Sequence, residues 1–126
     1  MDVIKGDTRT GTDLFSRPGE IVSELLHAAM FVRLRLGEFL EHYELTEGRY
    51  SVLTVLDAAG ASGLSQSEVA DRLMQSESNV STLVERLQRD RLVSRRWSDT
   101  DRRKRVLLLT ADGQQLFDRV EMARHR

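Results

Sequence analysis

The chain has 126 residues, 40% of them hydrophobic and 31% charged, and a formal net charge of −1, which fits one compact domain with its own core. The absence of cysteine excludes disulfides, thiolate catalysis, zinc–thiolate sites and cysteine redox sensing. No apolar run approaches the roughly 20 residues that a membrane span needs, and the N-terminal residues lack the apolar segment of a secretory signal, so we expect a cytoplasmic location.

Residues 1–18 are polar and without periodicity, and we interpret them as an N-terminal arm. Residues 19–44 predict a long helix, because apolar residues recur at steps of three and four. Leu26, Met30 and Leu34 form a second apolar line on this helix. One apolar stripe is enough to pack a helix on its own domain. Two stripes therefore favour a second subunit as the additional cover, and a central helix buried within one subunit is the alternative.

Polar caps mark the helices that follow. Thr46 begins a helix that ends at Gly60. Ser65 and Glu68 form a capping box at the start of a short helix. After a tight turn, Ser76 caps the next helix. Two capped helices separated by about three residues are the pattern of a helix-turn-helix.

The apolar period changes after this second helix. Residues 93–97 and 105–109 read as two strands joined by a charged tip, which predicts a β-hairpin with a long loop. We expect Trp97 on the first strand to pack on the core rather than to stack on a base. Thr110 caps a last helix that runs to the end of the sequence.

Charge is distributed unevenly along the chain. Residues 75–110 contain nine basic and five acidic side chains, a local net charge of +4, whereas the rest of the chain contains 10 basic and 15 acidic side chains, a net charge of −5. A basic segment on an acidic body is typical of a phosphate-binding face. A solvated arginine-rich hairpin is the alternative interpretation.

The polar side of the helix after Ser76 suits the major groove of B-form DNA, because a helix fits that groove and short hydrogen-bonding side chains near its N-terminus reach base edges. Ser76 serves mainly as the cap, and Arg86 suits either a guanine or a phosphate. The candidate DNA contacts on this helix are Ser76, Ser78, Asn79, Ser81, Thr82, Arg86 and Arg89.

The hairpin tip supplies a second candidate contact. Arg102 and Arg103 stand at the turn of a thin ribbon, and a guanidinium there can enter a narrow minor groove. Arg105 on the second strand adds a third candidate DNA contact. We interpret Asp99 and Asp101 as the partners that orient an arginine, with a solvent-exposed charge cluster as the alternative.

Nothing in the sequence selects a catalytic or metal site. The three histidines, His27, His42 and His125, are far apart, and the sequence contains no HExxH motif, nucleophile elbow or glycine-rich phosphate loop. We therefore expect no enzymatic activity, no metal and no cofactor.

The stretch from Leu45 to Leu116 resembles the MarR family of bacterial transcriptional regulators. The most specific match is the hairpin segment DTDRR at 99–103. The other matching segments are LT at 45–46, GLSQSEVA at 63–70, STLVERL at 81–87, LV at 92–93, VLLLT at 106–110, and Gly113.

The resemblance implies a mainly α winged helix-turn-helix with a small β-hairpin wing, in the order helix, helix, strand, helix, helix, strand, strand, helix. It also implies a homodimer on a pseudo-palindromic operator. In this scheme 19–44 is a dimerisation helix, 45–110 the DNA-binding domain, and 111–126 a C-terminal dimerisation helix that is shorter than usual for the family. The expected dimer contacts are Ile21, Leu25, Leu26, Met30, Leu116 and Val120.

Family members usually repress transcription, and often release DNA when a small aromatic or phenolic ligand enters a cleft between the dimerisation helices and the DNA-binding lobe. The resemblance makes His27, Phe31, Leu34 and Tyr50 candidates for lining that cleft, with packing as the alternative role for each. We expect a sequence-specific regulator of transcription that binds double-stranded DNA. The alternative is a winged helix that binds another protein and has no affinity for DNA.

Overall fold

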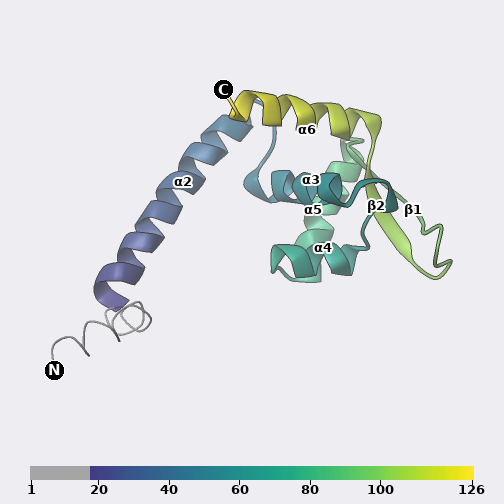
Figure 1. Ribbon diagram of the computed structural model, residues 1–126, viewed down its shortest axis with the longest axis horizontal. Coiled ribbons are helices and arrows are strands. Elements are labelled where there is room, and N and C mark those ends of the chain that lie inside the picture. The colour runs from purple at the N-terminus through teal and green to yellow at the C-terminus, as the bar shows by residue number, and fades with distance from the viewer. Residues whose placement is uncertain (1–17) are drawn as a thin grey trace, which may run out of the picture. The chain divides into compact units, whose positions relative to one another are not determined.

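A computed structural model describes residues 18–126, and it confirms a mainly helical fold with one two-stranded antiparallel hairpin (Figure 1). The predicted arm, apart from Pro18, lies outside the described residues. The elements are the π-helical turn η1 (Pro18–Val22), α2 (Ser23–Glu41), α3 (Glu47–Ala59), the 3-10 turn η2 (Gly60–Ser62), α4 (Gln66–Leu73), α5 (Glu77–Arg89), β1 (Val93–Trp97), β2 (Arg105–Leu109) and α6 (Ala111–Arg124). The chain divides into two compact units between Glu38 and Phe39.

Side-chain caps begin the last four α-helices where the sequence predicts them. Thr46, Ser65, Ser76 and Thr110 each accept a hydrogen bond from the backbone N–H three residues further on, at 3.0–3.3 Å. Glu68 completes the capping box by accepting a hydrogen bond from the backbone N–H of Ser65 at 3.4 Å. These bonds satisfy N–H groups that a helix start otherwise leaves without a partner.

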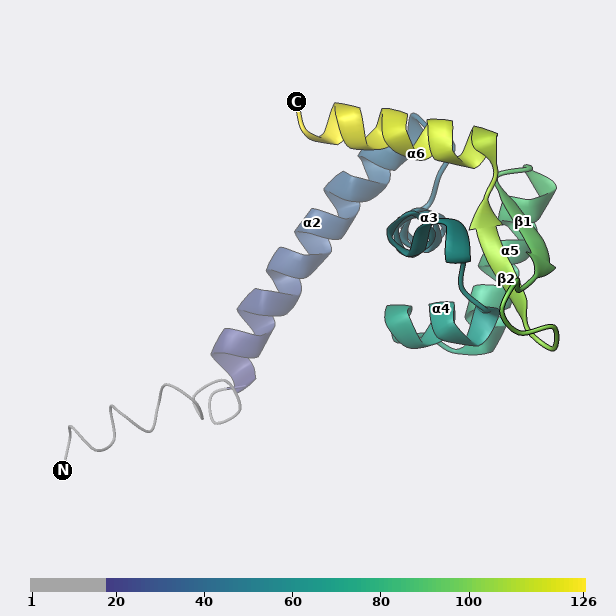
Figure 2. The same ribbon diagram turned by 45° about the vertical axis from the view of Figure 1, so that its right-hand side comes forward.

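The core of the second unit is built around α3, which lies between α6 and α4 and also contacts α5 and β2 (Figures 1 and 2). Leu53 on α3, Leu87 on α5 and Leu107 on β2 have almost no exposed surface. This packing brings α4, α5 and the hairpin into one unit, because each buries apolar side chains in the same core.

The hairpin pairs Val93 with Leu109 at its base and Trp97 with Arg105 at its outer end, which confirms both predicted strands. The additional strand expected before α4 is not formed. Leu64 makes only a single bridge to Leu107, with N–O distances of 3.2 and 2.7 Å. The preceding Gly63 has a φ of +68° and the following Ser65 is already the cap of α4, so one residue is all that can pair.

The prediction that Trp97 packs on the core is wrong. Its side chain is 59% exposed, because the end of β1 extends beyond the helices that bury Val93. The guanidinium of Arg105, its cross-strand neighbour, lies over the indole ring at 5.5 Å from the ring centre.

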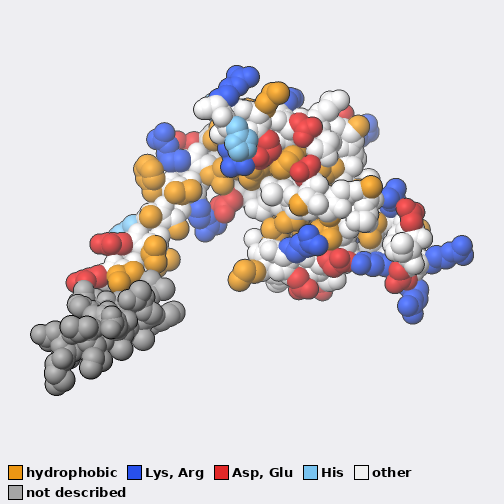
Figure 3. All heavy atoms as spheres, in the orientation of Figure 1, with side chains coloured by type: hydrophobic (Ala, Val, Ile, Leu, Met, Phe, Trp, Pro, Cys, Tyr) orange, Lys and Arg blue, Asp and Glu red, His pale blue; other side chains and the backbone are white. Residues whose placement is uncertain are grey.

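Within the first unit, α2 presents apolar side chains on its surface (Figure 3). Leu25, Leu26 and Met30, three of the predicted dimer contacts, are 56–61% exposed, and Ile21 is half-buried. On α6, by contrast, Val120 is fully buried and fills the core of its own unit rather than lying on a surface. None of the described helices is both long enough and apolar enough to cross a membrane.

Two glycines in helices provide a matched test of this packing. Alanine normally stabilises a helix interior by up to about 1 kcal/mol over glycine, and a Cβ at Gly37 on α2 would meet nothing within 4 Å. At Gly113 on α6 a Cβ would lie 2.0 Å from the backbone oxygen of Leu92. We expect Gly113→Ala to lower the free energy of unfolding by about 1–3 kcal/mol and Gly37→Ala to raise it or leave it unchanged in urea denaturation. Equal stability of the two variants would contradict the close approach of α6 to Leu92.

Candidate nucleic-acid interface

The helix α5 separates an apolar inner side from a polar outer side. Val80, Val84 and Leu87 are fully buried. Ser81 is half-buried, and the exposed candidates are Ser76, Ser78, Asn79, Thr82, Arg86 and Arg89. The Ser76 hydroxyl is occupied as the cap, and the Thr82 hydroxyl donates to the carbonyl oxygen of Ser78 at 3.3 Å, which leaves its oxygen able to accept.

Arg86 is held by a carboxylate that we did not predict. Its Nε donates to Oδ2 of Asp90 at 3.2 Å, one helical turn further on. Nη1 of Arg49, from α3, lies 3.7 Å from the same oxygen and has no hydrogen-bond partner among the described residues. The i, i+4 spacing of Arg86 and Asp90 was a visible signal for the first contact. The contact from Arg49 depends on the fold.

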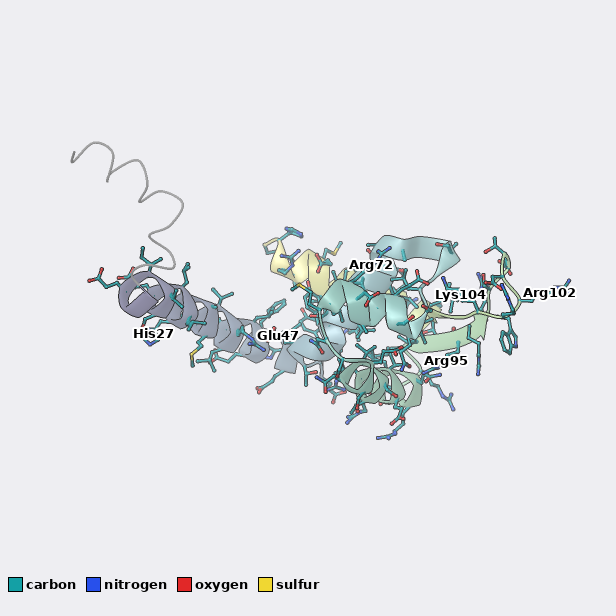
Figure 4. The ribbon with its side chains drawn as sticks, turned by 90° about the horizontal axis from the view of Figure 1, so that it is seen from below. His27, Glu47, Arg72, Arg95, Arg102 and Lys104 are labelled. Atoms are coloured by element: carbon teal, nitrogen blue, oxygen red, sulfur yellow. The ribbon has the colours of Figure 1, made fainter. Side chains whose placement is uncertain are left out.

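The hairpin tip projects away from the helices, with Arg102 at its far end (Figure 4). The Arg103 side chain is 93% exposed, and its Nε lies 3.5 Å from Oδ1 of Asp101, which also accepts from the backbone N–H of Arg103 at 3.0 Å. Asp99 instead pairs with Arg96 at 3.6 Å. Of the two predicted orienting carboxylates, Asp101 therefore contacts a tip arginine and Asp99 contacts an arginine of β1.

The middle and the outer end of the hairpin are attached to the helices by polar contacts that the sequence did not predict. Nη2 of Arg95 donates to Oε1 of Gln66 at 2.7 Å, and Lys104 forms an ion pair with Glu68. Lys104, together with the Ser65 hydroxyl and N–H, lowers the pKa of Glu68 below its usual range. Gln66 and Glu68 both lie in the first turn of α4, so β1 and the residue before β2 are attached to the same turn.

The side chains of this surface donate hydrogen bonds and carry positive charge. Figure 3 shows that Lys and Arg side chains gather at the outer end of the hairpin. Exposed guanidinium, hydroxyl and amide groups can bind phosphate oxygens and base edges. The described part of the chain contains no group of three His, Cys, Asp or Glu side chains placed to hold a metal ion.

The predicted ligand-cleft residues belong to two units. His27, Phe31 and Leu34 are exposed on α2. Tyr50 is half-buried on α3, where it stacks on Phe117 with ring centres 6.1 Å apart and its hydroxyl donates a hydrogen bond to Glu121. Burial, followed by this bond to a carboxylate, raises the pKa of Tyr50.

A separate open cleft of about 930 Å³ lies within the second unit. Its lining runs from the segment that connects α2 and α3 to the end of α5 and the first half of α6, and includes Arg49, Arg86, Asp90 and Arg119. None of the four predicted ligand residues lines it.

Residues 43–104 match the model of the MarR family. The chain is 32% identical over 88 residues to the HTH-type transcriptional regulator PrsX of Escherichia coli, a match that covers 70% of this chain and 53% of PrsX. It is also 32% identical over 94 residues to the HTH-type transcriptional repressor YetL of Bacillus subtilis, covering 71% of this chain and 56% of YetL. The chain thus spans about half the length of the curated relatives it matches.

Solved structures extend the similarity to the fold. CouR from Rhodococcus jostii bound to p-coumaroyl-CoA is 29% identical, with a TM-score of 0.76 over 82% of this chain and 71% of that one. A structure of the transcriptional repressor CouR bound to a 23-mer DNA duplex is 27% identical, with a TM-score of 0.74 over 86% and 75% of the two chains. The family model, the relatives and the winged-helix geometry agree: this chain belongs to the MarR family.

Proposed function

We propose that the protein is a transcriptional regulator that binds specific sequences of double-stranded DNA, with α5 in the major groove and the hairpin tip in the minor groove. The observation that carries this proposal is the presence, within one compact unit, of an exposed polar helix face and of a hairpin that ends in exposed arginines. The relatives PrsX and YetL, named as transcriptional regulators, support it.

On α5, we assign base reading to Asn79, Thr82 and Arg86. Asn79 and Thr82 lie near the start of the helix, where side chains reach base edges in helix-turn-helix complexes. Arg86 has the planar fork that binds O6 and N7 of guanine, and its contact with Asp90 favours one direction of the side chain. Of the remaining predicted contacts on this helix, Ser78, Ser81 and Arg89 are assigned to the phosphate backbone, and Ser76 is assigned to the cap.

On the hairpin, we assign minor-groove contact to Arg102 and Arg103. A thin two-stranded ribbon with exposed guanidinium groups at its turn suits the narrow groove, where the potential is most negative. Arg105 lies over Trp97 further from the tip, and we assign it to a phosphate at the groove edge.

The functional unit that we propose is a homodimer on a pseudo-palindromic operator. The exposed apolar side chains of α2 supply a surface that a second copy can bury, and two-fold symmetry would present one α5 to each half-site. Repression is the proposed effect, released by a small aromatic effector, since the relative CouR is a repressor and binds p-coumaroyl-CoA. We further propose that the protein acts in the cytoplasm and is not an enzyme.

Salt dependence tests DNA binding directly. If about six phosphates are contacted, log Kobs should fall against log salt concentration with a slope near −5. The measurement is fluorescence anisotropy of a labelled random-sequence duplex between 50 and about 200 mM salt. A protein-binding module would give no salt-dependent binding, and that result would refute the proposed function.

Two arginine variants test whether the minor-groove contact contributes general affinity and the major-groove contact contributes sequence preference. Arg103→Ala should weaken binding to many sequences alike, because a minor-groove arginine reads groove width more than base identity. Arg86→Ala should instead relax preference at one position, by about 1–3 kcal/mol if the contact is bidentate. Sequence selection from a random library measures both effects. The control is Arg126→Ala, which removes a positive charge beyond the end of α6 and should leave the selected sequences unchanged. If Arg86→Ala also left the selected sequences unchanged, Arg86 would contact a phosphate rather than a base.

The oligomeric state tests the role of α2. Leu26→Asp or Met30→Asp should yield monomers, because a carboxylate buried without a partner opposes association. Arg35→Asp, on a different side of α2, serves as the control and should leave the dimer intact. Sedimentation velocity measures the state of each variant. A stable dimer of Met30→Asp would show that this apolar line does not form the interface.

A further inference from the structure

We propose that Arg95 is a positioning residue, which fixes the hairpin relative to α4 and α5 so that the two groove contacts act together. The inference rests on the proposed DNA binding, and it assigns to Arg95 a task other than contact with DNA. The bonds that Arg95 makes to two glutamines on different helices carry the inference.

The guanidinium of Arg95 connects three elements. Arg95 stands on β1, its Nη2 donates to Oε1 of Gln66 on α4 at 2.7 Å, and its Nε donates to Oε1 of Gln88 on α5 at 3.4 Å. A guanidinium suits this task because its donors form a rigid planar fork. Arg95 is the middle residue of β1, and Figure 4 places it beside α5, with Arg102 at the far end of the hairpin.

Two further polar contacts attach the hairpin to the same region. Lys104 pairs with Glu68 in the first turn of α4, two residues from Gln66. Nη2 of Arg96 donates to the carbonyl oxygen of Ala61 at 2.9 Å. The hairpin is therefore held from β1 and from Lys104, the residue before β2, and the partners lie on three separate segments: η2, α4 and α5.

Apolar packing alone does not fix the outer part of the hairpin. Val93, Val106 and Leu107 are buried. The exposed residues further out are Arg96, Trp97, Arg102 and Arg103. A short two-stranded ribbon is marginally stable without other support. Burial of Val106 and Leu107 and the backbone bridge from Leu107 to Leu64 hold the middle of the hairpin, and the polar side-chain contacts at the edge of the core add to them. Arg95 makes two of these polar contacts.

Positioning matters because a duplex is contacted at two points at once. When the spacing between α5 and the tip is set in advance, binding of one groove places the tip arginine at the other without a further loss of conformational entropy. When the spacing varies, the minor-groove contact must first offset the conformational entropy lost on fixing the hairpin, so it contributes less to the free energy of DNA binding. Loss of Arg95 should therefore diminish what Arg102 contributes, which a direct contact between Arg95 and a phosphate would not do.

The first test needs no DNA. The chain contains no cysteine, so spin labels placed through Ser78→Cys on α5 and Thr100→Cys on the hairpin report one distance. In the otherwise unchanged protein we expect a narrow distance distribution, and in the Arg95→Ala, Gln66→Ala and Gln88→Ala variants a distribution at least about twofold broader. Arg72→Ala, which removes an arginine from α4 without touching these bonds, is the control. An unchanged width in all three variants would overturn the inference even if the protein binds DNA.

The second test couples Arg95 to Arg102 on a labelled duplex recovered by selection with the unchanged protein. We expect Arg102→Ala to weaken binding about tenfold alone but less than about threefold in the Arg95→Ala background, since coupled sites are not additive. Gln88→Ala should reproduce this loss although it removes no charge, and Arg95→Lys should not restore the coupling. Additive effects of Arg95→Ala and Arg102→Ala, with Gln88→Ala inert, would make Arg95 a direct DNA contact and overturn the inference. Failure of the unchanged protein to bind any duplex would refute the proposed function itself, while the spin-label widths would still decide whether Arg95 fixes the hairpin.

Discussion

The carboxylate of Glu68 is shared between the start of a helix and the attachment of the hairpin. It completes the capping box of α4 by accepting hydrogen bonds from Ser65, and it pairs with Lys104, the residue before β2. Ionisation is favoured by all of these partners, Lys104 most strongly, and so the pKa of Glu68 is lowered. The capping bonds and the ion pair are present together when Glu68 is charged, so one charge stabilises both the first turn of the helix-turn-helix and the position of the strand beside it.

Local signals predicted the elements well, because each acts over three or four residues. The caps at Thr46, Ser65, Ser76 and Thr110 begin helices through hydrogen bonds to their own chain neighbours, and the charged tip between the two segments marked where β1 ends and β2 begins. The same reasoning failed where the answer depends on what lies across the fold. Trp97 is exposed since no helix extends over the end of β1, although its residue type favoured burial.

The candidate surface was predicted as a set of residues and not as an arrangement. Exposure of Arg86, Arg102 and Arg103 followed from the amphipathic pattern and the charged loop. The contacts from Arg49 to Asp90 and from Arg95 to Gln66 join residues separated by 29 or more positions, and no periodicity reports such pairs. Val120 was misjudged for a related reason: an apolar residue on a terminal helix can face its own core or a partner, and only the packing of α6 on α3 decides between them.

The carboxylates on this surface limit how strongly it attracts DNA in general. Asp90 pairs with Arg86 and Asp101 with Arg103, so a carboxylate partly neutralises the charge of each arginine before DNA binds. Both arginines are largely exposed, and exposed pairs of this kind are worth little, about 0–1 kcal/mol, so a phosphate or a guanine can replace or join the carboxylate at small cost. The local net charge of +4 is accordingly modest for a segment with nine basic residues. Affinity for a particular duplex then depends on where its grooves place their acceptors, because an arginine gains binding energy only where an acceptor lies within reach of its N–H donors.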